Sequence, residues 1–213
     1  MTQPDPDPPE ERWTRLLTGL GCTTAECRRT FAEVALHYRS PGRHYHTLDH
    51  ILDVLGTVEL LRGGACGPAL RLAAWLHDVV YDPRAGDNEE QSAAFARALL
   101  GPPRLAETLL AETGRLILLT RSHQADPADL DGQALLDADL AILGAEPPAY
   151  DRYALAIRAE YAWVPEADYR AGRRRVLESF LRRPRIYATE ALFARLEARA
   201  RANLERERAS LGS

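Results

Sequence analysis

The sequence contains no lysine, so all 27 of its basic side chains are arginines, and 31 acidic residues give it a formal net charge of −4. A chain without an excess of positive charge is not drawn to nucleic acid by bulk electrostatics. It also lacks any apolar run that approaches the roughly 18 to 20 residues needed to cross a bilayer. We therefore expect neither a nucleic-acid partner nor a membrane partner.

Cysteine is scarce as well. Cys22, Cys27 and Cys66 are an odd number and have no zinc-binding spacing. They are typical of reduced thiols in a cytoplasmic protein. The first residues are rich in proline and aspartate and lack the basic and apolar regions of a signal peptide. We expect a cytoplasmic protein.

No alternating run of β-branched residues is present, so the sequence does not predict a sheet. From Glu10 onward nearly every segment has the spacing of apolar residues that is typical of helices. A chain of 213 residues fits one well-buried domain. We predict a disordered tail over residues 1–9 and then, over 10–213, a single all-α domain with about eight to ten helices.

Local signals predict where these helices begin and end. Thr23 or Thr24 can cap the second helix, Thr47 the third, and Asn88 the fifth. Later helices are predicted from about Leu105 to Thr120, from Pro127 to Gly144 and from Pro147 to Tyr161. Two further helices are expected, divided near Pro184, and Thr189 can cap the last of them. The fourth helix is expected to start at Pro68 and to end near residues 82–83.

That fourth helix carries an adjacent His77-Asp78 pair inside an otherwise apolar run. Burying a carboxylate there costs several kcal/mol unless a cation or a hydrogen-bond partner neutralises it. Taken alone, the pair fits a structural interpretation in which His77 binds a backbone carbonyl and Asp78 pairs with an arginine.

Two other segments change this interpretation. Residues 43–51 contain several histidines, and residues 135–143 contain Asp137 and Asp139, both against a helical apolar pattern. Together with His77-Asp78 they supply His, His-Asp and Asp on three segments. This mixed nitrogen and oxygen set suits a divalent ion such as Mn, Fe, Co, Ni, Zn or Mg.

The order and setting of the three segments resemble the HD superfamily of metal-dependent phosphohydrolases, and within it the stand-alone predicted HD phosphohydrolases. The similarity runs from about His44 through the arginine-rich C-terminal helices. It implies an HD-type helical bundle and a hydrolase of a phosphomonoester or nucleotide, with metal-bound water as the nucleophile. The ppGpp hydrolases have an acidic pair directly after the His-Asp, whereas Val79-Val80 follow here. This difference argues against alarmone hydrolysis.

The resemblance also implies roles for individual residues. The metal ligands would be His50, His77, Asp78 and Asp139, with Asp137 as the alternative to Asp139. Asp78 would in addition orient or deprotonate the attacking water.

A Tyr-His-x-x-x-His run similar to residues 45–50 occurs in the cyclic-nucleotide phosphodiesterases, where the second histidine is a ligand and the first donates a proton. By that resemblance His46 is a candidate general acid. The alternative is a surface histidine that caps the loop.

Further residues are candidates for a second metal ion or for the substrate. His123, Glu89 and Glu90 can contribute to a second ion or to substrate binding, although the two glutamates fit a solvated capping sequence equally well. Arg43 and Arg158 are the arginines expected to contact a phosphate, because the guanidinium group suits bidentate phosphate binding.

Two other functions compete with phosphohydrolysis. One is a non-catalytic, metal-stabilised nucleotide-binding or regulatory module. The other is an HD-fold di-iron oxygenase, which would require more histidines than His123 supplies. The expected partner is a small phosphorylated molecule, and the long C-terminal helix, 188–211, would suit self-association into a homo-oligomer.

Overall fold

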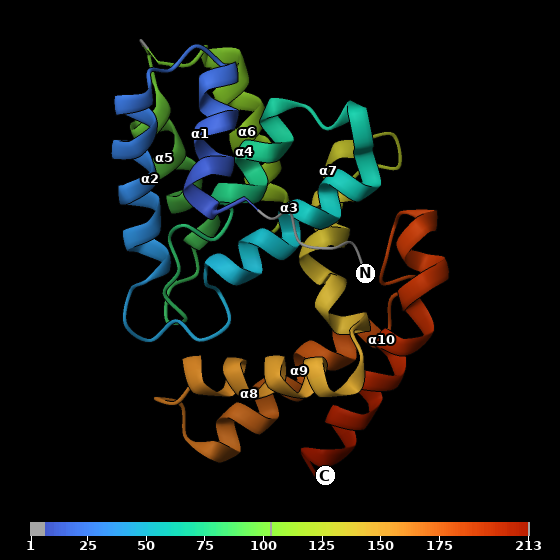
Figure 1. The fold of residues 1–213 in the computed structure, drawn as a ribbon. Helices are drawn as coiled ribbons and strands as arrows, with labels where there is room; N and C mark the ends of the chain where they lie inside the picture. Colours follow the sequence, from blue (N-terminus) through green and yellow to red (C-terminus); the bar gives the residue numbers. More distant parts are fainter. Residues whose placement is uncertain (1–6, 103, 213) are drawn as a thin grey trace. The chain divides into compact units, whose positions relative to one another are not determined.

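A computed structural model describes residues 7–102 and 104–212. Within these ranges the chain forms ten α-helices, two short 3₁₀-helices and no strand (Figure 1), so the predicted all-α class is confirmed. The helices are α1 (Pro9–Gly19), α2 (Thr24–Tyr38), α3 (Leu48–Arg62), η1 (Gly63–Ala65), α4 (Pro68–Leu76), α5 (Asn88–Leu100), α6 (Glu107–Leu119), α7 (Leu130–Asp139), η2 (Leu140–Gly144), α8 (Pro147–Glu160), α9 (Glu166–Leu181) and α10 (Glu190–Ser210).

Several helix starts follow the local chemistry of the sequence. The Thr23 hydroxyl accepts from the Glu26 backbone N–H, and the Glu26 carboxylate accepts from the Thr23 N–H, which is a complete capping box. Pro68 occupies the first turn of α4, where a missing N–H costs nothing. Thr189 caps α10 by accepting from the Leu192 N–H. These predictions are confirmed.

Thr47 is the N-cap residue of α3, as predicted, although its side chain makes no capping hydrogen bond. Other boundaries were predicted wrongly. Asn88 is the first residue of α5 and not its cap, because its side-chain amide binds the backbone N–H and carbonyl of Asp82, each at 3.0 Å. Helix α4 ends at Leu76, several residues before the predicted end, and α7 begins at Leu130 rather than at Pro127.

The helices group into two compact units, Met1–Ala138 and Asp139–Ser213. The single-domain assignment stays a prediction. Most of the expected tail, residues 1–6, lies outside the described residues, and its last residue, Pro9, is the first residue of α1. No helix in the described part of the chain is long and apolar enough to span a membrane.

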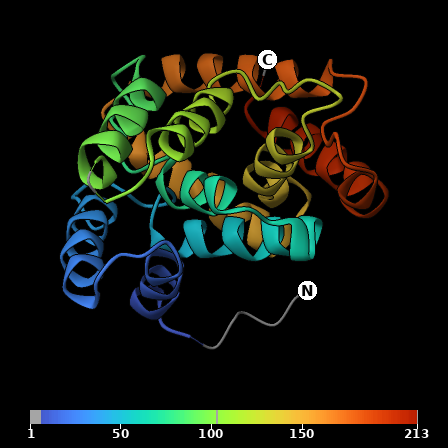
Figure 2. The ribbon, with the colours of Figure 1, turned by 90° about the horizontal axis from the view of Figure 1, so that it is seen from above.

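The first unit is organised around two tryptophans. The rings of Trp13 and Trp75 meet edge to face at 5.4 Å, and the Trp13 indole N–H donates to the Thr30 hydroxyl at 3.0 Å. Helices α1 and α2 lie side by side, as Figures 1 and 2 both show, and α6 packs against α4 and α5. The same core extends to α7 through Ala134, Leu135 and Ala138, so α7 is fixed by the apolar interior of this unit.

In the second unit, η2 packs closely against α10. The Asn203 side-chain amide donates to the Leu143 and Ala145 carbonyls, each at 2.9 Å, and thereby pairs backbone groups at the end of η2. The Arg173 guanidinium on α9 makes a buried, bidentate ion pair with Glu207 on α10. Packing and polar pairing together hold these helices.

Candidate metal centre

The adjacent pair His77 and Asp78 lies directly after the end of α4. The preceding residues, from Leu72 to Leu76, are all buried, and His77 is only 1% exposed. His77 keeps helical backbone dihedrals, with φ of −61° and ψ of −33°, and its N–H donates to the Ala73 carbonyl at 2.9 Å. Its Nε2 lies 3.2 Å from Asp78 Oδ2. The two side chains therefore meet at the C-terminal end of α4.

His50 approaches the same carboxylate from α3. It is the third residue of that helix, on the face that carries the buried Ile51 and Val54, and it is 5% exposed. Its Nε2 lies 3.6 Å from Asp78 Oδ2. This is longer than a hydrogen bond, which is about 2.7–3.2 Å, but it is an ordinary separation for two ligands of one ion.

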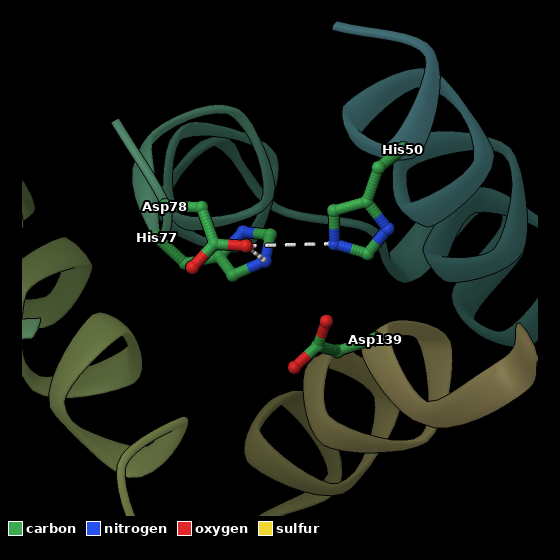
Figure 3. A group of neighbouring side chains, drawn as sticks. All are labelled: His50, His77, Asp78 and Asp139. Carbon is green, nitrogen blue, oxygen red and sulfur yellow. Dashed lines mark ion pairs between the residues drawn. The ribbon is translucent and has the colours of Figure 1, made fainter. Parts of the chain in front are cut away.

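The fourth member of the group is Asp139, the last residue of α7. One ligand atom from each of His50, His77, Asp78 and Asp139 lies within 4.8 Å of the others, and Figure 3 shows the four side chains facing a common point. Asp137 is buried on the same helix but is not in this group. The structure thus brings together the four predicted ligands and places Asp139 there in preference to Asp137.

The protonation of His77 suits metal binding. Its Nδ1 lies 3.2 Å from the Ala74 carbonyl oxygen, which can only accept, so Nδ1 must carry the hydrogen. In the neutral ring this leaves a lone pair on Nε2, the atom that faces Asp78. Backbone carbonyls commonly orient metal-binding histidines in this way.

Asp78 is a charged carboxylate in this setting. Burial disfavours its ionised form, but the imidazoles of His77, His46 and His50 outweigh burial and hold the pKa of the Asp78 carboxyl well below its usual value. A carboxylate that is ionised at neutral pH can ligate a cation without first losing a proton.

These four residues fit a divalent ion. They offer two imidazole nitrogens and two carboxylates, a set accepted by Mn, Fe, Co, Ni and Zn. Metal bonds of about 2.0–2.2 Å place two ligands of one ion at most about 4.4 Å apart, close to the separations found here. The group can hold a metal ion, whose identity the donor set does not determine.

His46 lies beside this group. Its ring stacks on Tyr81 with centroids 4.0 Å apart and meets His50 edge to face at 6.0 Å. Its charge is one of those that lower the pKa of Asp78, so the imidazole is close to that carboxylate. Tyr81 was not predicted as part of the site, because a lone tyrosine after Val79-Val80 does not indicate a stack on a distant loop.

The residues predicted for a second metal ion are not in the four-residue group. Glu90 forms an ion pair with Arg121 on the chain segment after α6, and Glu89 lies in the first turn of α5. His123 has a left-handed backbone, with φ of 49°, and its N–H donates to Leu119 at the end of α6. The role of these three residues at a second ion or at the substrate stays a prediction.

The two arginines predicted to bind phosphate have other contacts. The Arg43 guanidinium donates to backbone carbonyls of His46, Asp78 and Val79. In the second unit, Arg158 binds the Tyr161 carbonyl at 2.7 Å and pairs with Glu166. Backbone and carboxylate oxygens thus accept from both guanidinium groups, and the phosphate-binding role of the two arginines stays a prediction.

Comparisons with known proteins were made for the sequence and for the fold. No family model matches the sequence, and no curated protein and no solved structure is significantly similar to it. Membership of the HD superfamily therefore stays a prediction.

Proposed function

We propose that this protein is a divalent-metal-dependent phosphohydrolase that acts on a phosphomonoester or a nucleotide. The observation that carries the proposal is the convergence of His50, His77, Asp78 and Asp139, from three separate segments, on one point. Two histidines and two carboxylates hold the ion and leave the remaining coordination positions to water and substrate. A divalent ion at such a site polarises a phosphoryl oxygen and lowers the pKa of water.

Two residues at the group support a hydrolytic role. Asp78 is ionised and 19% exposed at its side chain, so one carboxylate oxygen can orient or deprotonate an attacking water. His46, which stacks on Tyr81, would give a proton to the leaving oxygen of the ester. The substrate class comes from the family resemblance and not from a substrate pocket.

The experiment begins with metal content and ends with phosphate release. Protein purified without a His-tag is analysed for metals, stripped, reloaded with Mn²⁺, and assayed against a panel of nucleotides and phosphomonoesters. Asp139→Asn is the test variant. Asp137→Asn is its matched control, since it changes an acidic residue of the same helix outside the group.

We expect about one equivalent of metal and metal-dependent phosphate release, both lost in Asp139→Asn and both kept in Asp137→Asn. Metal binding without turnover of any substrate would favour the regulatory module. Two equivalents of iron would favour the oxygenase. Failure to bind any of Mn²⁺, Ni²⁺ or Fe²⁺ would overturn the ligand assignment.

A further inference from the structure

The side chain of Arg43 joins the loop of the candidate general acid to the turn that carries two ligands. Its Nη1 donates to the His46 carbonyl at 2.9 Å and to the Asp78 carbonyl at 2.7 Å, and its Nη2 donates to the Val79 carbonyl at 2.8 Å. One nitrogen therefore binds the backbone of both His46 and Asp78, which are 32 positions apart in the sequence. Both hydrogens of Nη1 are used in this way.

Two tyrosines enclose the same guanidinium group. Its carbon lies 5.1 Å from the centre of the Tyr38 ring and 5.6 Å from the centre of the Tyr81 ring. Tyr38 is itself fixed, because it is 2% exposed and its hydroxyl donates to the Trp75 carbonyl at 2.7 Å. The His46 ring stacks on the face of the Tyr81 ring. Arg43 is thus anchored to the core and also contacts the ring that supports His46.

We propose that Arg43 is a positioning residue that fixes His46 and Asp78 relative to one another, and so sets both the affinity for the metal and the placement of the proton donor. The effect of Arg43 on the proton donor rests on the proposed function, whereas its effect on metal affinity does not. It replaces the role in phosphate binding that the sequence suggested for Arg43.

Arginine is required here for a geometric reason. The planar guanidinium presents several N–H donors in fixed directions, whereas a lysine ammonium is a compact group on a flexible stem. A lysine at position 43 keeps the positive charge but cannot hold three carbonyls in the same arrangement. Groups that orient metal ligands typically change metal affinity or activity about 10- to 100-fold when they are mutated.

The test compares Arg43→Lys with the matched control Arg104→Lys. Arg104 also donates to a backbone carbonyl, that of Leu99 at 3.0 Å, and belongs to the same unit without contacting the four ligands. Full-length proteins are stripped of metal and titrated with Mn²⁺ by calorimetry. Steady-state kinetics with an alkyl phosphomonoester, whose leaving oxygen needs a proton, then separate kcat from KM.

For Arg43→Lys we expect Mn²⁺ affinity to fall about tenfold or more, and kcat to fall with little change in KM. Arg104→Lys should match the wild type in both measurements. A raised KM with unchanged Mn²⁺ affinity would overturn the proposal in favour of a phosphate contact. Unchanged Mn²⁺ affinity and unchanged kinetics would overturn it outright.

A second variant keeps the proposal testable if Arg43→Lys does not fold. Tyr81→Leu removes the ring between Arg43 and His46 and leaves the three carbonyl bonds in place. It should lower kcat and alter the basic limb of the pH profile while Mn²⁺ affinity stays close to that of the wild type. A kcat and pH profile equal to those of the wild type would contradict the positioning of His46.

The two proposals can fail separately. A wild-type protein that binds Mn²⁺ but hydrolyses no substrate would overturn the phosphohydrolase function. The Mn²⁺ affinities of Arg43→Lys and Arg104→Lys would still decide whether Arg43 positions the ligands.

Discussion

His77 Nε2 lies 3.2 Å from Asp78 Oδ2, although the two residues are adjacent in the sequence. His77 has helical backbone dihedrals at the C-terminal end of α4, and both groups face the same point in Figure 3. The Nδ1–H of His77 is held by the Ala74 carbonyl, so the orientation of the ring is set before a ligand arrives.

Metal binding should stabilise the folded protein through the four ligands. At a concentration of Mn²⁺ about 100 times its Kd, the free energy of unfolding should rise by about 2.7 kcal/mol in the wild type. The same rise is expected in Asp137→Asn and no rise in Asp139→Asn, as measured by thermal or urea unfolding with and without Mn²⁺. The reverse pattern would make Asp137 the ligand.

His46 should matter most for substrates with poor leaving groups. Replacing it by glutamine removes the proton donor, so kcat for an alkyl phosphomonoester should fall about 10²- to 10⁴-fold. The effect on p-nitrophenyl phosphate should be small, because p-nitrophenolate leaves without a proton. Mn²⁺ affinity, measured by titration, should be unchanged. An equal loss of kcat on both substrates would argue against a general acid.

Asp129, beside the start of α7, should contribute to stability in a pH-dependent way. A hydrogen bond from Arg115 is the main cause that lowers the pKa of the Asp129 carboxyl, and the Gly132 N–H adds to it. The pKa of Asp129 is lower in the folded protein than its unfolded value of about 3.9. The contribution of Asp129 to the free energy of unfolding is therefore complete above a pH of about 3.9, and it is lost as the pH falls through the folded pKa.

The variant Asp129→Asn tests this dependence, because asparagine keeps the ability to cap a helix. In metal-free protein it should cost about 1 kcal/mol at pH 7 and much less at pH 3, as measured by urea unfolding. In an Arg115→Gln background the cost at pH 7 should shrink, since the ion pair is already gone. A cost independent of pH would contradict this account.

Gly144 should tolerate no side chain. An added Cβ would lie 2.6 Å from the Leu196 Cβ and 2.9 Å from the Tyr187 hydroxyl, both on packed parts of the second unit. We expect Gly144→Ala to lower the free energy of unfolding by about 1–3 kcal/mol. The control is Gly172→Ala within α9, where the nearest atom is 3.9 Å away. That change should be neutral or stabilise by roughly 0.5–1 kcal/mol, because alanine favours a helix.

Asn88 and Arg43 show why local sequence does not fix hydrogen-bond partners. Asn88 is a residue type that often caps helices, but its amide binds the backbone of Asp82, six residues earlier. Arg43 has the charge of a phosphate ligand, and folding also brings two backbone carbonyls of a distant turn to its guanidinium group. In each case the choice between a local and a distant hydrogen-bond partner depends on where the rest of the chain lies.

The sequence by itself determined the all-α class and most helix boundaries, and it offered His50, His77, Asp78 and either Asp137 or Asp139 as candidate ligands. These depend on apolar periodicity, on capping residues such as Thr23, and on residue chemistry, all of which are local properties. Only the tertiary structure decided between Asp137 and Asp139, ended α4 before His77, and assigned Arg43 to the backbone of two loops. The physical reason is that ligation and hydrogen bonding require atoms within a few ångströms, and for residues far apart in the chain that distance is set by packing alone.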